Sequence, residues 1–281
     1  SPAVYRIMLK TTGFFIAHGF PTLPYFYIMF IQHPRSHSSP AQRIISLVPS
    51  ITEVLYNLGL EQETVGITKF CVHPEHWFRS KPRIGGTKQV HINRITDLQP
   101  DLVIANKEEN VQEQVEEIAR NFPVLLTEIQ NLDDALNMLL DIGMLTGTSE
   151  KAIGLSQQIH AGFKALPKPT NLKNAAYLIW KKPYMAAGGG TFIDSMLAYA
   201  GFSNAFQDKT RYPVVTEDDL RQSQCQEILL SSEPYPFKDS DIKELQDILP
   251  NARVRLVDGE LFSWYGSRLL HSPGYFAQLM Y

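Results

Sequence analysis

Short apolar segments that alternate with helical patterns constrain the fold of this 281-residue chain more than any other feature. Each segment has the length of a buried strand, and each is followed by apolar residues at helical spacing. Strands that alternate with helices indicate a parallel sheet, so we predict an α/β protein. The predicted strands fall in two series, at residues 43–50, 64–68, 98–106 and 122–129, and then at 174–183, 225–232 and 252–259.

A single long helical pattern separates the two series. Over residues 148–166 the apolar stripe consists of Ala152, Leu155, Ile159, Phe163 and Leu166. At about 1.5 Å per residue, such a helix spans somewhat under 30 Å, which is long enough to join two lobes. We therefore predict an N-terminal lobe at 43–147, a connecting helix at 148–167 and a C-terminal lobe at 168–281.

Local signals predict where individual helices begin and end. Ser50 followed by Glu53 predicts a capping box at the start of the first helix. The next helical pattern, LDDALNMLLDIGMLTG, starts directly after Asn131, which we predict to be its N-cap. Gly147 is predicted to end that helix.

Residues 1–42 differ from the rest of the chain. An apolar run interrupted by His18, Pro21 and Pro24 matches a signal peptide only loosely. A membrane span is less consistent still, since two prolines and a histidine are costly in lipid. This part is interpreted as an N-terminal extension or targeting segment, without a structural assignment.

Charge and cysteine content exclude several classes of protein. The formal net charge of -3 and the pI near 6.2 provide no basic field for nucleic acid. Cys71 and Cys225 lie far apart, which excludes a disulfide framework or a zinc ribbon.

Several motifs together resemble one family of binding proteins. RIISLVPSITEVLYNLGL, VGITKFCVHPE and INRITDLQPDLVIAN occur in that order from Arg43 to Asn106, and PYMAAGGGTFIDSMLAYAGFSNAF begins at Pro183. This pattern resembles the periplasmic binding proteins of ABC importers for cobalamin, haem and ferric siderophores, and most of all the cobalamin-binding members. The resemblance covers roughly residues 43–281. It implies two Rossmann-like lobes with mostly parallel sheets, one long bridging helix and a ligand cleft between the lobes.

The resemblance also assigns residues to ligand binding. Loop aromatics after strands suit a corrin or porphyrin, which is a broad and largely apolar disc. Arg268 could donate to a carboxylate, amide or phosphate of the ligand, although a solvated arginine at a helix start explains it equally well. Capping of the core remains an alternative for each aromatic residue, and Thr87 stands where some cobalamin-binding relatives have an aromatic. The predicted ligand-binding residues are Phe70, Tyr184, Tyr212, Trp264, Tyr265 and Arg268.

The resemblance implies partners as well. Asp218 and Asn93 map to the positions at which the family docks onto a membrane permease. Asn93 is neutral, so docking there would be weaker or would shift to Asp97. The expected partners are an ABC permease with its ATPase subunits and one metal-chelate ligand. We expect a monomer in the periplasm or at the outer face of the cytoplasmic membrane, with no nucleic acid and no resident cofactor.

Alternative interpretations remain open at this point. Cys71, His73 and His76 could ligate a metal, or form the centre of a metal-dependent α/β enzyme, but no catalytic motif accompanies them. A haem or ferric-siderophore receptor is the alternative within the binding class. The glycines of 188–190 are interpreted as a turn that lets the backbone approach a bulky ligand, or as an anion cradle.

Overall fold

The computed structural model describes residues 39–280, together with the backbone of 5–9 and 26–30. Contacts within the chain define two compact units. Unit 1 contains residues 1–128 and 136–156, and unit 2 contains residues 129–135 and 157–281. The helix predicted over 148–166 is observed as α6 (Ser149–Lys164), and the division between the units falls within it. The lobe limits inferred from the sequence alone remain a proposal.

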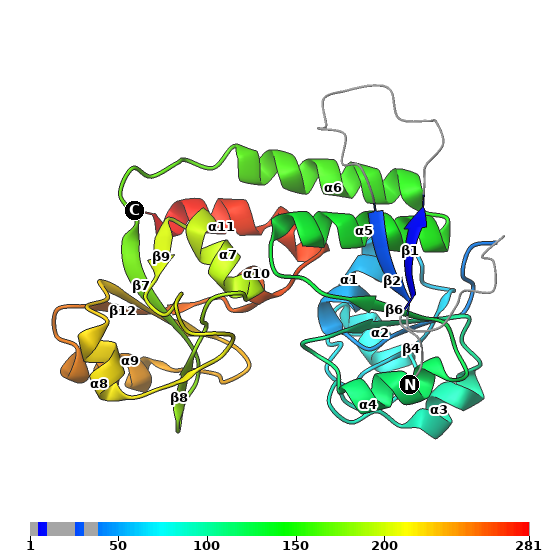
Figure 1. Cartoon of the computed structure of the whole chain (residues 1–281), viewed down its shortest axis with the longest axis horizontal. Helices are drawn as coiled ribbons and strands as arrows, with labels where there is room; N and C mark the ends of the chain where they lie inside the picture. Colours follow the sequence, from blue (N-terminus) through cyan, green and yellow to red (C-terminus); the bar gives the residue numbers. More distant parts are fainter. Residues whose placement is uncertain (1–4, 10–25, 31–38, 281) are drawn as a thin grey trace. The chain divides into compact units, whose positions relative to one another are not determined.

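Unit 1 is built on a six-stranded sheet with the order β1-β2-β6-β5-β3-β4 (Figure 1). Its four parallel strands follow the apolar segments predicted from the sequence, whereas β1 and β2 form an antiparallel pair that joins β6 at Phe30 and Leu125. The strands are β1 (Tyr5–Leu9), β2 (Phe26–Phe30), β3 (Ile44–Ser46), β4 (Thr64–Ile67), β5 (Leu102–Asn106) and β6 (Val124–Thr127). The helices are α1 (Pro49–Asn57), α2 (Glu75–Ser80), α3 (Ile92–Leu98), α4 (Gln112–Ala119) and α5 (Leu132–Thr146).

The predicted capping box at the first helix is wrong. α1 begins at Pro49, with Val48 as its N-cap and no side-chain cap. Proline suits the first helical position because its φ is already helical and it lacks the N–H that would need a partner. Ser50 therefore lies inside the helix, where it is buried.

The predicted limits of α5 are confirmed. The Oδ1 atom of Asn131 accepts from the backbone N–H of Asp134 at 2.9 Å. Gly147, directly after the helix, has a φ of +72°, a conformation that glycine adopts without strain.

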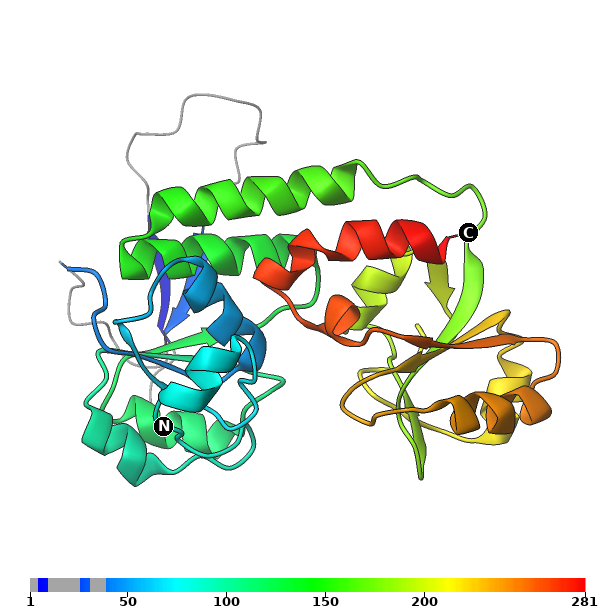
Figure 2. The ribbon, with the colours of Figure 1, turned by 180° about the vertical axis from the view of Figure 1, so that it is seen from behind.

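Unit 2 contains a second α/β sheet, with the order β10-β8-β7-β11-β12 and with β9 paired to β7. β7, β9, β11 and β12 are parallel, while β8 and β10 are antiparallel. Figure 2 shows α7 and α11 on one side of this sheet and α8 and α9 on the other. The strands are β7 (Lys173–Trp180), β8 (Tyr184–Ala186), β9 (Phe202–Asn204), β10 (Val214–Val215), β11 (Glu227–Ser231) and β12 (Arg253–Val257). The helices are α7 (Phe192–Tyr199), α8 (Glu217–Gln222), α9 (Asp239–Ile248), α10 (Glu260–Ser263) and α11 (Ser272–Leu279), with a 3₁₀ turn at Ser267–Leu270.

The central strands of both sheets are continuous, largely apolar segments. Every residue of β5 and of β11 is buried, as expected for parallel strands that are covered on both faces. The one charged residue among them, Glu227, is paired with Arg255 at 3.1 Å and with Lys173 at 3.4 Å. Among the described residues, no helix is long and apolar enough to cross a membrane.

Candidate functional site

The carboxyl ends of the parallel strands in unit 1 are joined by one buried amide side chain. The Nδ2 atom of Asn110 donates to the carbonyl oxygens of Leu47 at 3.3 Å and Thr87 at 3.1 Å. Its Oδ1 atom accepts from the backbone N–H of Asn106 at 2.8 Å. Three loops are thereby held together at the edge of the sheet where ligands of open α/β sheets bind.

Phe70 projects from this edge, in the loop that follows β4. Its side chain is 50% exposed, the largest such value for an aromatic residue in the described part of the chain. The Nζ atom of Lys69 lies 5.0 Å from the ring centroid, within cation–π range. A Cβ atom at Gly86 would lie 3.1 Å from Cε2 of Phe70, so the ring rests closely on the backbone there. The structure thus gives Phe70 an exposed and supported ring, and its role in ligand binding stays a prediction.

Cys71 points away from that surface, into the core of unit 1. Its Sγ atom lies 3.0 Å from the hydroxyl of Thr52 and 3.1 Å from that of Thr68, and burial raises the pKa of the thiol. His76 is exposed, with its Nε2 atom 3.9 Å from Glu61. Within residues 39–280, no three histidine, cysteine or acidic side chains come together as metal ligands. The structure therefore does not bring Cys71, His73 and His76 together as one ligand set, because the thiol of Cys71 points into the core.

Tyr184 begins the antiparallel strand β8 in unit 2, where it is partly exposed. Its hydroxyl donates to Oε1 of Glu244 at 2.9 Å. The Nζ atom of Lys181 donates to Oε2 of Glu244 at 2.7 Å and to Asp241 at 2.6 Å. Burial, followed by the hydrogen bond to Glu244, raises the pKa of Tyr184, while the two carboxylates raise the pKa of Lys181. The tyrosine is thus neutral and fixed to α9.

Trp264 and Arg268 form a second polar and aromatic group in unit 2. The Nε1 atom of Trp264 donates to Oε1 of Glu233 at 2.9 Å, and Ser263 donates to the same oxygen at 2.6 Å. The guanidinium of Arg268 lies 4.7 Å from the indole ring and pairs with Glu260 at 2.5 Å. Trp264 is buried and Arg268 is mostly covered, so the interpretation of Arg268 as a solvated arginine is wrong.

Two further predicted aromatics lie in different surroundings. Tyr265 is buried, with its ring edge-on to Phe192 at a centroid distance of 5.8 Å. Tyr212 is partly exposed, between Arg211, which has a φ of +64°, and Pro213. The ligand roles of both tyrosines remain predictions, as do those of Trp264 and Arg268.

The glycine-rich turn at 188–190 packs against another part of the chain. The N–H of Gly188 donates to the carbonyl oxygen of Arg211 at 2.6 Å, and that of Gly189 donates to Lys209 at 2.8 Å. A Cβ atom at Gly188 would lie 2.1 Å from the carbonyl oxygen of Lys209. Gly188 and Gly189 therefore make room for the chain segment 207–211, and the amides of these two glycines are already hydrogen-bonded within the protein rather than available to an anion.

The two predicted docking residues are both exposed on helices. Asp218 lies in the first turn of α8, where Arg221 pairs with it at 2.8 Å. Beside it, Thr216 and Asp219 form a capping box, and the hydrogen bonds from Thr216 lower the pKa of Asp219 to about 2. Asn93 lies in the first turn of α3.

Sequence reasoning missed the polar residues that support these aromatics. Asn110, Glu233 and Glu244 each fix a loop or a ring, and none belongs to a recognisable motif. For two of them a signal was present. Asn110 and Glu233 come shortly after fully buried strands, which is where parallel sheets gather functional side chains.

Comparisons with known proteins agree with this fold. A model of the periplasmic binding protein family matches residues 44–246, which is most of the chain. The vitamin B12-binding protein of Pectobacterium carotovorum is 24% identical over 236 residues, which cover 82% of this chain and 84% of that protein. The solved vitamin B12-binding protein BtuF of Vibrio cholerae superimposes with a TM-score of 0.71 at 20% identity, over 86% of this chain and 97% of that one. The haem-binding protein RhuT of Roseiflexus sp. RS-1 gives 0.72 at 22% identity, over 86% and 100%.

Proposed function

Because this chain belongs to the periplasmic binding protein family, a family of binding proteins rather than enzymes, we propose that it is the substrate-binding subunit of an ABC importer and captures a cobalamin-like corrinoid. The curated relatives that support this choice are vitamin B12-binding proteins, matched over most of their length. The ligand is cargo that is released, so no resident cofactor is part of the proposal.

The observation that carries the proposal is the exposed ring of Phe70. Leaving half of a phenylalanine in water is unfavourable unless a partner covers it. A corrin is broad, flat and largely apolar, so a rigid aromatic face can bury it with little loss of conformational freedom. The close support from Gly86 and the hydrogen bonds of Asn110 hold this face ready before the ligand arrives.

In unit 2, we propose that Tyr184 and Tyr212 contact the ligand through their partly exposed rings. Trp264, Tyr265 and Arg268 are more deeply packed, so they would offer only an edge to it. Release of the ligand to the membrane permease and its ATPase subunits would involve Asp218 and Asn93. We further propose that the protein acts as a monomer in the periplasm.

A visible absorption titration with cyanocobalamin tests this function, with calorimetry to give the stoichiometry. We expect one-to-one binding, weakened about 10-fold by Phe70→Ala, since loss of an aromatic contact costs about 1.4 kcal/mol. Met144→Ala is the matched control, because it truncates another exposed apolar side chain of unit 1 and should leave affinity unchanged.

The same titration with hemin and with a ferric siderophore separates the ligand classes. One-to-one binding of either of these chelates, with none of cyanocobalamin, would replace the corrinoid by the haem or siderophore alternative. Binding of cyanocobalamin that Phe70→Ala leaves intact would reject the proposed surface. If the folded protein bound none of the three, the proposed cargo would be wrong.

A further inference from the structure

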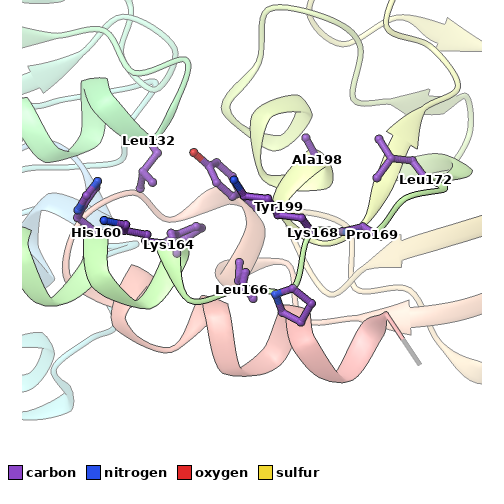
Figure 3. A pocket seen from close by; sticks show the side chains of 11 residues that line it. Leu132, His160, Lys164, Leu166, Lys168, Pro169, Leu172, Ala198 and Tyr199 are labelled. Carbon is purple, nitrogen blue, oxygen red and sulfur yellow. The ribbon is translucent and has the colours of Figure 1, made fainter.

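Unit 2 contains a pocket that is lined by none of the residues assigned to the proposed ligand. It encloses about 410 Å³ between the last turns of α6, the segment 165–172 and the end of α7 (Figure 3). Segment 165–172 leads directly into the first residue of β7, Lys173. Tyr184 follows the other end of β7, so the pocket lies at the amino end of that strand.

The charge of the lining is unlike that of the whole chain. His160, Lys164 and Lys168 are basic, and none of the eleven lining residues is acidic. The chain as a whole has more acidic than basic side chains, with a formal net charge of -3. His160 and Lys164 are one helical turn apart, and Figure 3 shows them side by side at one end of the pocket. This end of the pocket suits a negatively charged group.

The rest of the lining is apolar and is fixed to the core. Phe163 is buried, and the ring of Tyr199 packs edge-on against it, with 4.9 Å between the two ring centroids. At the rim, Leu172 is 45% exposed, one of the most exposed large apolar residues in the described part of the chain. An apolar wall beside cationic groups matches a ligand that has an anionic head and an apolar tail.

Two features within the fold weaken the positive electrostatic potential that the basic residues create in the pocket. Lys164 lies in the last turn of α6, where its charge also stabilises the helix dipole. Burial, together with the negative charge of Asp133, raises the pKa of the Tyr199 hydroxyl. Lys168 lies beyond the end of α6, so its charge does not serve to stabilise the helix dipole. The carboxylate or phosphate of a ligand would bind at the end of the pocket formed by His160 and Lys164, with Lys168 as a further cation of the lining.

We propose that this pocket is a second binding site, which takes a small amphipathic anion with a carboxylate or phosphate head and a short apolar tail. The site does not depend on the cargo of the importer. Its volume lies in the range of small-molecule sites, at about 300–1,000 Å³. The anion could come from free solutes or from the headgroup region of an anionic lipid.

Calorimetry with octanoate and octyl phosphate tests the site in the full chain. We expect saturable one-to-one binding, weakened about 5-fold by Lys164→Gln and by Lys168→Gln, since each removes a charge-assisted hydrogen bond. Lys243→Gln, which removes an exposed helical lysine elsewhere in unit 2, should bind as the parent does. Ala198→Trp should block the pocket while the circular dichroism spectrum and cyanocobalamin binding stay unchanged.

Two comparison ligands test whether the site requires both an anionic head and an apolar tail. Inorganic phosphate alone should bind at least 10-fold more weakly, since it lacks the tail, and octyltrimethylammonium should not bind. Equal binding of the cationic amphiphile, or octanoate binding that survives Ala198→Trp, would overturn the proposal. Sedimentation with phosphatidylglycerol vesicles that Lys168→Gln abolishes would identify a lipid as the source, whereas binding of octanoate without sedimentation would identify a free anion.

Discussion

At the scale of single residues, Asp141 on α5 shows how burial alone sets a property that can be measured. Burial raises the pKa of its carboxyl from 3.8 to about 7 in the folded protein. Below pH 3.8 both the folded and the unfolded chain are protonated at this site, so burial has no ionisation cost. Between pH 3.8 and 7 the unfolded chain loses the proton first, and above pH 7 the cost is constant. The carboxyl therefore lowers stability increasingly as the pH rises through this window.

We expect Asp141→Asn to remove this cost. A shift of one pKa unit corresponds to about 1.4 kcal/mol, and partial exposure reduces the effect, so the gain at pH 8 should be about 2 kcal/mol. The gain should shrink toward zero at pH 4. Urea unfolding followed from pH 4 to 8 measures it, with the exposed Asp208→Asn as a variant that should show no such trend. A pH-independent difference between Asp141→Asn and the parent would contradict the assignment.

At the scale of elements, two glycines in consecutive helices predict opposite effects of the same substitution. On α6, a Cβ atom at Gly154 would meet nothing within 4 Å, so Gly154→Ala should stabilise unit 1 by about 1 kcal/mol through helix propensity. On α5, a Cβ atom at Gly143 would lie 2.4 Å from the Cβ of Ala152. Gly143→Ala should therefore destabilise the protein by about 2 kcal/mol through overpacking.

Thermal unfolding of the two variants beside the parent measures both effects. The pair is matched in chemistry and in unit, so only the packing of α5 against α6 differs between them. An equal rise in melting temperature for both variants would mean that the two helices are not in close contact at Gly143.

Much of the element order could be predicted because it is encoded locally. β5 and β11 are continuous apolar runs, and the ends of α5 carry their own signals in Asn131 and Gly147. The features that the sequence did not predict depend on contacts between residues that are distant in sequence. The contact of Gly188 with the chain near Lys209, and the burial of Trp264 against Glu233, cannot be inferred from periodicity. For the candidate site, the family resemblance pointed to Phe70 as a loop aromatic, but no motif in the sequence pointed to the hydrogen bonds of Asn110 that fix the surrounding loops.

At the scale of the whole molecule, the proposed docking onto a permease uses one residue in each unit. The proposed contacts differ in strength between the units. Asp218 is an exposed carboxylate, although Arg221 shares it, whereas Asn93 is a neutral amide. A charge-assisted hydrogen bond to an arginine of the permease is about twice as strong as a neutral one, so unit 2 should dominate docking.

We therefore expect Asp218→Asn to reduce the stimulation of ATP hydrolysis by the cognate transporter in proteoliposomes by about 5-fold. Asn93→Asp should increase the affinity of docking by a similar factor, since it restores a charge in unit 1. Asp239→Asn is the matched control, because Asp239 is also an exposed acid in the first turn of a helix of unit 2. Both effects should fall at high salt, as electrostatic contacts do. If Asp239→Asn and Asp218→Asn reduced stimulation equally, net charge rather than a docking residue on α8 would govern the interaction.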